Sequence, residues 1–285
     1  MVKSAVWFEA KRRILPNRYF AIKQKNPIFI VKQRLFYCNP TTVMTALGIS
    51  SFWESRLFLI LILFHLFPLN MMASTPTTLF APIRSTIERV QKEADNIPDD
   101  RKQQLKKIAL FIQTKLAANE PAQLMFICTH NSWRSHTSQI WAQTLAAYHG
   151  LQGVKAFSAG TEVTAFNDRA VKALQRAGFT MTKSTEGKNP QYAVQYASGA
   201  EPIKAFSKLI NDAANPSSNF CAVMNCSQAD KTCPMVPGAA LRVSTPYDDP
   251  KDFDGTPQET AKYDERCRQI AREMAYLFSQ VHVQK

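Results

Sequence analysis

The sequence lacks an apolar run of the ~20 residues that a membrane-spanning helix needs. Its most membrane-like run, Leu57–Phe67, is about half that length and is interrupted by His65. The stretch that precedes this run is also far too long for the charged leader of a signal peptide. We therefore expect no stable membrane span in this protein.

Cysteine is sparse, with six residues in a chain of 285. Secreted disulfide scaffolds are short and rich in cysteine, so that class is disfavoured, and cytoplasmic thiols with a chemical role are expected instead. The chain also lacks a second cysteine pair that would complete a zinc site with Cys226 and Cys233. We expect neither a metal centre nor a bound cofactor.

The positive charge is unevenly distributed along the chain. Residues 1–70 hold ten Lys and Arg but only two acidic residues, so most of the net charge of +13 lies there. The remainder is only mildly cationic, which argues against nucleic acid as a partner. Because the same segment shows no clean periodicity and is followed by Met71 and Met72, we expect residues 1–71 to be poorly structured or to reflect an over-extended gene start.

Two helices are expected between residues 72 and 121. The first begins near Ser74–Pro76, and the second begins at Pro98 and ends before Pro121. Apolar residues recur in both at spacings of three and four, as on one face of a helix: Leu79, Ile83, Ile87 and Val90, then Leu105, Ile108, Phe111, Ile112 and Leu116. This N-terminal α-hairpin holds no candidate catalytic group, and a role in packing or dimerisation is expected.

Residues 122–285 alternate between strand and helix patterns, which predicts an α/β fold with a four-stranded parallel sheet and helices on both faces. The expected strands are Gln123–Cys128, Val154–Phe157, Phe220–Asn225 and Leu241–Thr245. The expected helices are Ser135–His149, Asn167–Ala177 closed by Gly178, and Thr256–Gln280. Residues 184–218, rich in Ser, Asn, Gly, Pro and Gln, predict a long, partly irregular insertion.

The chemistry concentrates in the segment Cys128-Thr129-His130-Asn131-Ser132-Trp133-Arg134-Ser135, called here the anion loop. It joins a predicted strand to a predicted helix, the junction at which open parallel sheets bind ligands. Backbone N–H groups and the positive end of the helix can converge there on one anion, and Arg134 can add a fork of donors.

The positive end of the helix and the charge of Arg134 would also stabilise a thiolate at Cys128 and make it a nucleophile. Ser135 can hydrogen-bond to that thiolate, and Asn131 can brace the loop. A bare Cys-x5-Arg pattern is a weak signal, because a buried cysteine beside a surface arginine would also produce it. The strand before and the helix after the loop favour a site for a tetrahedral oxyanion.

The anion loop resembles that of the low-molecular-weight protein tyrosine phosphatase superfamily, which includes the thioredoxin-coupled arsenate reductases. The resemblance covers about residues 122–282 and includes Phe157–Thr161. It implies a phosphotyrosine protein phosphatase I-like fold over residues 122–285. It also implies that Cys128 attacks while Arg134 and the loop amides hold a small oxyanion; those amides belong to Thr129, His130, Asn131, Ser132, Trp133 and Ser135.

Two residues depart from the superfamily pattern. His130 stands in place of a small glycine, and Trp133 stands where many members have a small residue or cysteine. We expect both to narrow the mouth of the pocket. The superfamily places a general acid immediately before a proline, which selects Asp249 of Asp248-Asp249-Pro250, with Asp248 as the alternative. A simple solvated turn is the competing interpretation of this acidic stretch.

Cys226 and Cys233 lie in Cys226-Ser-Gln-Ala-Asp-Lys-Thr-Cys233, called here the two-cysteine segment, which resembles the redox segment of the arsenate reductases. The resemblance implies that Cys226 attacks a Cys128–arsenic adduct, that Cys233 resolves the resulting disulfide, and that a thioredoxin-like protein reduces the last pair. Inert core thiols remain an alternative. Cys221 and Cys267, on apolar faces, are expected to serve packing.

Three functions therefore remain under consideration. Arsenate reduction is favoured by the two extra thiols. Hydrolysis of phosphotyrosine or small phosphomonoesters needs only Cys128, Arg134 and Asp249, and its ring-stacking wall would come from the insertion, for instance from Tyr192 or Tyr196. A phosphate-binding module without turnover is disfavoured, because nucleophile, arginine and acid are all present.

Overall fold

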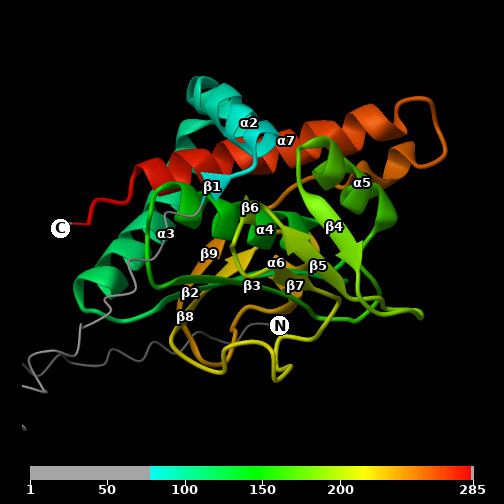
Figure 1. The fold of residues 1–285 in the computed structure, drawn as a ribbon. Coiled ribbons are helices and arrows are strands. Elements are labelled where there is room, and N and C mark those ends of the chain that lie inside the picture. The colour runs from blue at the N-terminus through cyan, green and yellow to red at the C-terminus, as the bar shows by residue number, and fades with distance from the viewer. Residues whose placement is uncertain (1–77, 284–285) are drawn as a thin grey trace, which may run out of the picture. The chain divides into compact units, whose positions relative to one another are not determined.

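The structure, a computed structural model, describes residues 78–283, so the expectations for residues 1–71 lie outside the described part of the chain. Its central sheet has four parallel strands in the order β3-β2-β8-β9 (Figure 1). The strands are β2 (Ala122–Cys128), β3 (Val154–Gly160), β8 (Phe220–Met224) and β9 (Ala239–Ser244). The predicted four-stranded parallel sheet is confirmed.

The helices that connect and flank this sheet lie close to their predicted positions, with one addition. They are α2 (Ala81–Gln91), α3 (Asp99–Ala117), α4 (Arg134–Tyr148), α5 (Asp168–Arg176), α6 (Ser227–Thr232) and α7 (Glu259–Ser279), with 3-10 turns η3 (Ala94–Asn96) and η4 (Pro250–Phe253). Helix α6 was not predicted, because its short polar sequence buries only Ala229. Across residues 78–283, no helix has the length and apolar character needed to cross a bilayer.

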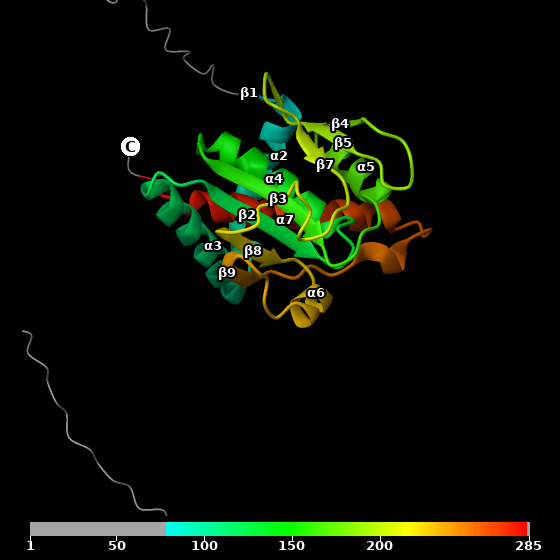
Figure 2. The same cartoon turned by 90° about the horizontal axis from the view of Figure 1, so that it is seen from below.

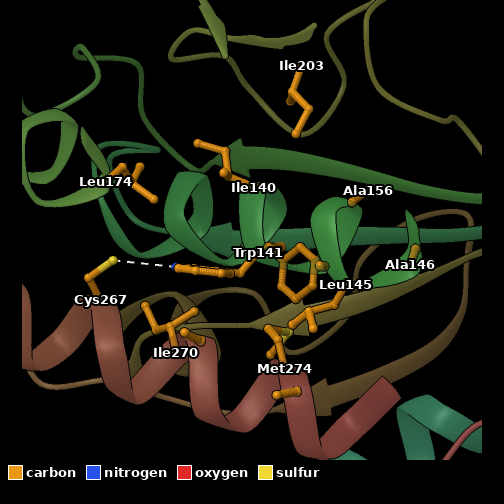
Figure 3. Close-up of a cluster of buried hydrophobic side chains, with 14 of the residues drawn as sticks. Ile140, Trp141, Leu145, Ala146, Ala156, Leu174, Ile203, Cys267, Ile270 and Met274 are labelled. Carbon is orange, nitrogen blue, oxygen red and sulfur yellow. Dashed lines mark hydrogen bonds between the residues drawn. The ribbon is translucent and has the colours of Figure 1, made fainter. Parts of the chain in front are cut away.

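The two faces of the central sheet are covered unequally. One face presents Leu124, Phe126 and Val223 to a large core formed with α2, α3, α4, α5 and α7. In that core Trp141 of α4 points toward α7, and its indole Nε1 donates to Cys267 Sγ at 3.4 Å (Figure 3). The other face is covered by a smaller cluster that includes Ala229 of α6. Helices thus lie on both faces, but the long ones are on one side.

Helices α2 and α3 both pack against α7 and contribute to the larger core. Helix α2 begins at Ala81 rather than near Ser74–Pro76, because Thr78–Leu79 form a short strand, β1. Helix α3 begins where predicted, with Pro98 at its N-cap position and two aspartates in its first turn. These helices are therefore built onto the same core as the sheet.

The segment 184–218 is more ordered than its composition predicts. It contributes β5 (Tyr192–Gln195), β6 (Ala197–Ser198) and β7 (Ile203–Ala205). With β4 (Thr180–Lys183), strands β5 and β7 form an antiparallel sheet, and β6 pairs with β1. This small sheet lies beyond the β3 edge of the central sheet, whereas α6 lies toward the opposite edge (Figure 2). Strands this short carry too little alternation to be predicted.

Candidate active site

The anion loop occupies the junction between the carboxyl end of β2 and the start of α4. Cys128 is the last residue of β2 and Arg134 is the first of α4. The Cys128 side chain is almost fully buried, and its Sγ lies 3.1 Å from Ser135 Oγ. A cavity of about 310 Å³ opens above this thiol. The sulfur is thus positioned beneath a pocket and beside a hydroxyl that can donate to a thiolate.

Asn131 braces the loop from below. Its φ of 43° places it in the left-handed region, which asparagine tolerates better than most residues. Its Nδ2 donates to Ser135 Oγ at 2.8 Å, and its Oδ1 accepts from the Lys208 amide at 2.8 Å. Both Asn131 and Ser135 are fully buried. Because the side chain ties the loop to α4 and to residue 208, the backbone of the loop is fixed before any ligand arrives.

Gly160, at the end of β3, allows a second close approach to the loop. A Cβ at this position would lie 2.8 Å from the Asn131 nitrogen and 2.9 Å from the Thr129 carbonyl oxygen. No side chain fits at such distances from backbone atoms. Gly160, within the stretch Phe157–Thr161 that carries part of the family resemblance, therefore has a physical reason, since β3 and the anion loop touch here.

Sequence analysis missed a buried basic group under the loop. Lys208 is 3% exposed, and its Nζ donates to Ser158 Oγ at 3.4 Å, which in turn lies 3.0 Å from His136 Nδ1. Burial lowers the pKa of Lys208 to about 8. Burial, and then the Lys208 charge, lower the pKa of His136 well below its ordinary value. A lysine in a segment rich in Ser and Asn gives no sequence signal of burial.

Arg134 and Asp249 meet across the pocket. Arg134 Nη2 lies 3.1 Å from Asp249 Oδ2, and its Nη1 donates to the Tyr247 carbonyl at 3.2 Å. Trp133 Nε1 donates to Asp249 Oδ1 at 3.1 Å. Asp248, by contrast, has an 89% exposed side chain that pairs with Arg266. Of the two aspartates left open by the sequence, Asp249 is the one that lines the pocket with Cys128 and Arg134.

The mouth of the pocket is lined by residues from four segments. His130 is half exposed, and its Nε2 lies 3.4 Å from Glu162 Oε2. Of the other residues predicted to hold the oxyanion, Ser132, Trp133 and Arg134 line the pocket, whereas the side chains of Thr129, Asn131 and Ser135 are not among its lining residues. Five lining residues were not predicted: Thr164, Asn167, Lys251, Asp254 and Tyr263. The aromatic ring that joins Trp133 at the mouth is Tyr263.

The expectation that Tyr192 or Tyr196 forms an aromatic wall at this pocket is wrong. Both side chains are buried in the large core, and Tyr192 Oη donates to Asp168 Oδ1 at 3.4 Å. The reason is that β5 and the residue after it pack inward as part of the small sheet. The insertion thus contributes core residues where an exposed loop was expected.

Cys226 lies beside the anion loop. Strands β2 and β8 are parallel neighbours with Ile127 opposite Met224, so the residues that follow them emerge at the same sheet edge. Cys226 Sγ is 3.4 Å from Thr129 Oγ1 and accepts from the Ala229 amide at 3.3 Å, so it caps α6. Like Cys128, it is almost fully buried.

Cys233 lies at the other end of α6, where it is half buried. Arg242 of β9 holds this end: its Nη2 donates to the Asp230 carbonyl at 2.7 Å and to the Cys233 carbonyl at 3.1 Å, and it pairs with the Asp230 carboxylate at 2.6 Å. Sequence analysis missed Arg242, since an arginine in a strand gives no indication of its partners.

The other two described thiols, Cys221 of β8 and Cys267 of α7, do not line the pocket. Burial raises the pKa of both Cys221 and Cys267 to about 12, so neither is a thiolate at neutral pH. All five cysteines within residues 78–283 are free. The same residues hold no group of three or more Cys, His, Asp and Glu side chains arranged to bind a metal ion.

Comparisons with known proteins identify a matching family and several similar proteins. Residues 123–193 match the family described as low molecular weight phosphotyrosine protein phosphatase. The arsenate reductase of Bacillus subtilis is 30% identical over 145 residues, which cover 51% of this chain and 86% of that protein.

Two solved structures are also similar. One is a low molecular weight phosphotyrosine phosphatase from Vibrio cholerae, with 16% identity, a TM-score of 0.37, and coverage of 55% of this chain and 95% of that one. The other is an arsenate reductase in the phosphate-binding state, with 17% identity, a TM-score of 0.38, and coverage of 56% and 99%.

The chain therefore belongs to the low-molecular-weight phosphotyrosine protein phosphatase superfamily, with arsenate reductases among its relatives. Within that superfamily it is an enzyme of the arsenate reductase or the phosphatase type, the two types named by its curated relative and by the matching family.

Proposed function

We propose that this enzyme reduces arsenate to arsenite through Cys128, Cys226 and Cys233. The observation that carries the proposal is the contact between Cys226 Sγ and Thr129 Oγ1, the residue that follows Cys128 in the anion loop. A phosphatase needs no second thiol at this sheet edge. A relay that passes electrons between cysteines does need one.

In the first step the Cys128 thiolate attacks arsenic, and one arsenate oxygen leaves as water, which gives a Cys128–arsenic(V) adduct. The loop amides and Arg134 hold the remaining oxygens. Arg134 Nε is buried and makes no hydrogen bond within the described residues. That donor is therefore available to an oxyanion, and Asp249, which lines the same pocket, delivers the proton to the leaving oxygen.

In the second step the Cys226 thiolate attacks Cys128 Sγ. The sulfur–arsenic bond breaks, its electron pair remains on arsenic, and arsenite leaves as the two cysteines form a disulfide. Cys233 then attacks Cys226 Sγ and releases the Cys128 thiolate. A dithiol reductant of the thioredoxin type reduces the Cys226–Cys233 disulfide and closes the cycle.

The capping role of Cys226 suggests how Cys233 reaches it. In the reduced protein Cys226 Sγ accepts the Ala229 amide and so stabilises the start of α6. An N-cap contact is worth about 1 kcal/mol. Attack on Cys128 removes this acceptor, and a six-residue helix with one buried side chain is then held mainly by Arg242 at its other end. Loosening of α6 would bring Cys233 toward Cys226.

The test follows NADPH consumption by the full chain with thioredoxin, thioredoxin reductase and arsenate. We expect arsenate-dependent oxidation of NADPH that disappears in Cys226→Ser and in Cys233→Ser. Cys221→Ala is the matched control, because this thiol is buried in β8 away from the loop, and it should retain turnover. Loss of activity in the control as well would remove the evidence for a relay.

The second candidate is hydrolysis of phosphotyrosine or small phosphomonoesters. The observation that favours it is the placement of Asp249 in the same pocket as Cys128 and Arg134, since ester cleavage needs an acid for the leaving oxygen. Hydrolysis of p-nitrophenyl phosphate that survives Cys226→Ser and Cys233→Ser, with no response to arsenate, would establish this function in place of the first.

A further inference from the structure

Helix α3 reaches the segment that carries Asp249. This helix precedes the first strand of the central sheet and lies outside residues 123–193, which match the family. Arg101 in its first turn extends to Thr245–Pro250, called here the acid loop. Its Nη2 donates to the Pro246 carbonyl at 2.6 Å. A helix that sequence analysis assigned to packing thus touches the loop that supplies the candidate acid.

Arg101 is held in that position by a buried carboxylate. Its Nη1 lies 3.4 Å from Glu273 Oε2 on α7, and the two side chains are 17% and 2% exposed. Its guanidinium also lies over the Tyr247 ring, 5.2 Å from the centroid. Because Tyr247 Oη donates to Glu273 Oε2 at 2.8 Å, these three side chains form one network.

The network joins the acid loop to the anion loop. Arg101 binds the Pro246 carbonyl, and Arg134 binds the next carbonyl, that of Tyr247. The Tyr247 amide in turn donates to the Asn225 carbonyl at 3.0 Å. Asp249 follows two residues later. Two arginines from different helices therefore hold consecutive carbonyls three and two residues before the acid.

From these contacts we infer that Arg101 is a positioning residue for Asp249. Helix α3 would then contribute to the active site by holding the acid loop in place. The inference rests on the proposed role of Asp249. A displacement of about 1 Å at a proton donor is enough to reduce turnover strongly. Loss of Arg101 therefore slows the step in which the leaving oxygen is protonated and leaves oxyanion binding by the anion loop intact.

The test compares Arg101→Met with Lys107→Gln, which removes the same charge from an exposed position on α3. Hydrogen exchange of residues 245–254 is measured beside that of residues 128–135. In Arg101→Met we expect faster exchange in the first segment only. Turnover of phenyl phosphate, which needs the acid, should fall about tenfold. Turnover of dinitrophenyl phosphate, whose leaving group needs no proton, and inhibition by inorganic phosphate should change less than about twofold.

Two further variants keep the test decisive. Arg101→Met with Glu273→Gln avoids an unpaired buried carboxylate, so it serves where the single variant does not fold. Arg101→Lys should restore part of the loss. Exchange that is unchanged at 245–254, or that rises equally at 128–135 in the double variant, would overturn the inference. If the wild type neither reduces arsenate nor hydrolyses esters, the proposed function fails, and the exchange data alone decide whether Arg101 holds the acid loop.

Discussion

The anion loop and the two-cysteine segment begin at the ends of neighbouring parallel strands but are held in different ways. The loop is tied from inside by Asn131, whose side chain is fully buried and uses both its amide nitrogen and its oxygen. The two-cysteine segment buries only Ala229 within its helix and is held mainly by Arg242. Met235, two residues beyond the segment, is 84% exposed.

This difference suits the two tasks of the proposed reaction. A loop that stabilises an oxyanion gains from being fixed, because its donors then need no rearrangement when charge develops. A segment whose thiol must travel to another sulfur needs low local stability. The four predictions that follow test the contrast, from the largest expected effect to the smallest.

The largest effect is expected for Asn131→Ala. Alanine cannot brace Ser135 or accept from the Lys208 amide, and it is strained at a φ of 43°. We expect a loss of roughly 3 kcal/mol in the free energy of unfolding and a fall in turnover of about a hundredfold or more. Urea unfolding and the coupled assay measure the two quantities.

Asn119→Ala is the matched control for that variant. Asn119 is also left-handed, with a φ of 55°, but it is exposed after α3. Its replacement should cost about 1 kcal/mol from backbone strain and leave turnover intact. Equal losses in the two variants would show that strain, and not the brace, determines the stability of the loop.

Lys208→Met tests the buried support of the loop through pH. The pKa of Lys208 is lowered to about 8 in the folded protein from an ordinary 10.5. Between these values the unfolded chain binds more protons, so the contribution of this group to stability rises with pH. The wild type should gain roughly 2–3 kcal/mol between pH 7.5 and 10 relative to Lys208→Met. The exposed Lys155 serves as control, and Lys155→Met should produce no such difference.

Arg242→Gln tests how firmly the two-cysteine segment is held. It removes donors to the Asp230 and Cys233 carbonyls, so α6 should open more often. Alkylation of Cys233 by iodoacetamide should accelerate about fivefold, which corresponds to about 1 kcal/mol of local stability. Affinity for phosphate should remain unchanged. Lys231→Gln removes an exposed charge from the same segment, and an equal acceleration there would contradict a specific role for Arg242.

The smallest effect is expected for Trp133→Phe. The variant loses the hydrogen bond to Asp249 Oδ1, but Arg134 and the Lys251 amide still bind that carboxylate. Turnover should fall about two- to threefold, with inhibition by phosphate unchanged. Trp141→Phe removes the contact to Cys267 in the core and should lower stability while sparing turnover. If Trp133→Phe instead lowered stability and left turnover unchanged, the role of Trp133 would be purely structural.

The sequence predicts best where one residue pattern has one physical cause. The strand before Cys128 and the helix after it follow from a buried apolar run and from helical spacing, and the structure has both there. Gly178 was expected to close a helix, and it follows α5 with a φ of 110°.

Features made by distant partners could not be predicted in this way. The small sheet depends on pairing between strands of two to four residues, which is too short for a periodic signal. The burial of Lys208 and the reach of Arg101 to Pro246 depend on which segments fold against them. The sequence does not indicate which residue a charged side chain will contact in the fold. The roles of Lys208 and Arg101 were therefore not predicted.

The pairing of β1 with β6 constrains the order in which the segments of the chain can fold. Thr78 and Leu79 pair with Ser198 and Ala197, and the Phe80 amide donates to the Tyr196 carbonyl. Synthesis on the ribosome proceeds from the N-terminus. Strand β1, which precedes α2, therefore cannot pair until more than a hundred further residues have been made and β6 has emerged. Closure of such a long loop is entropically slow. The first described strand of the chain is therefore expected to be among the last to settle during folding.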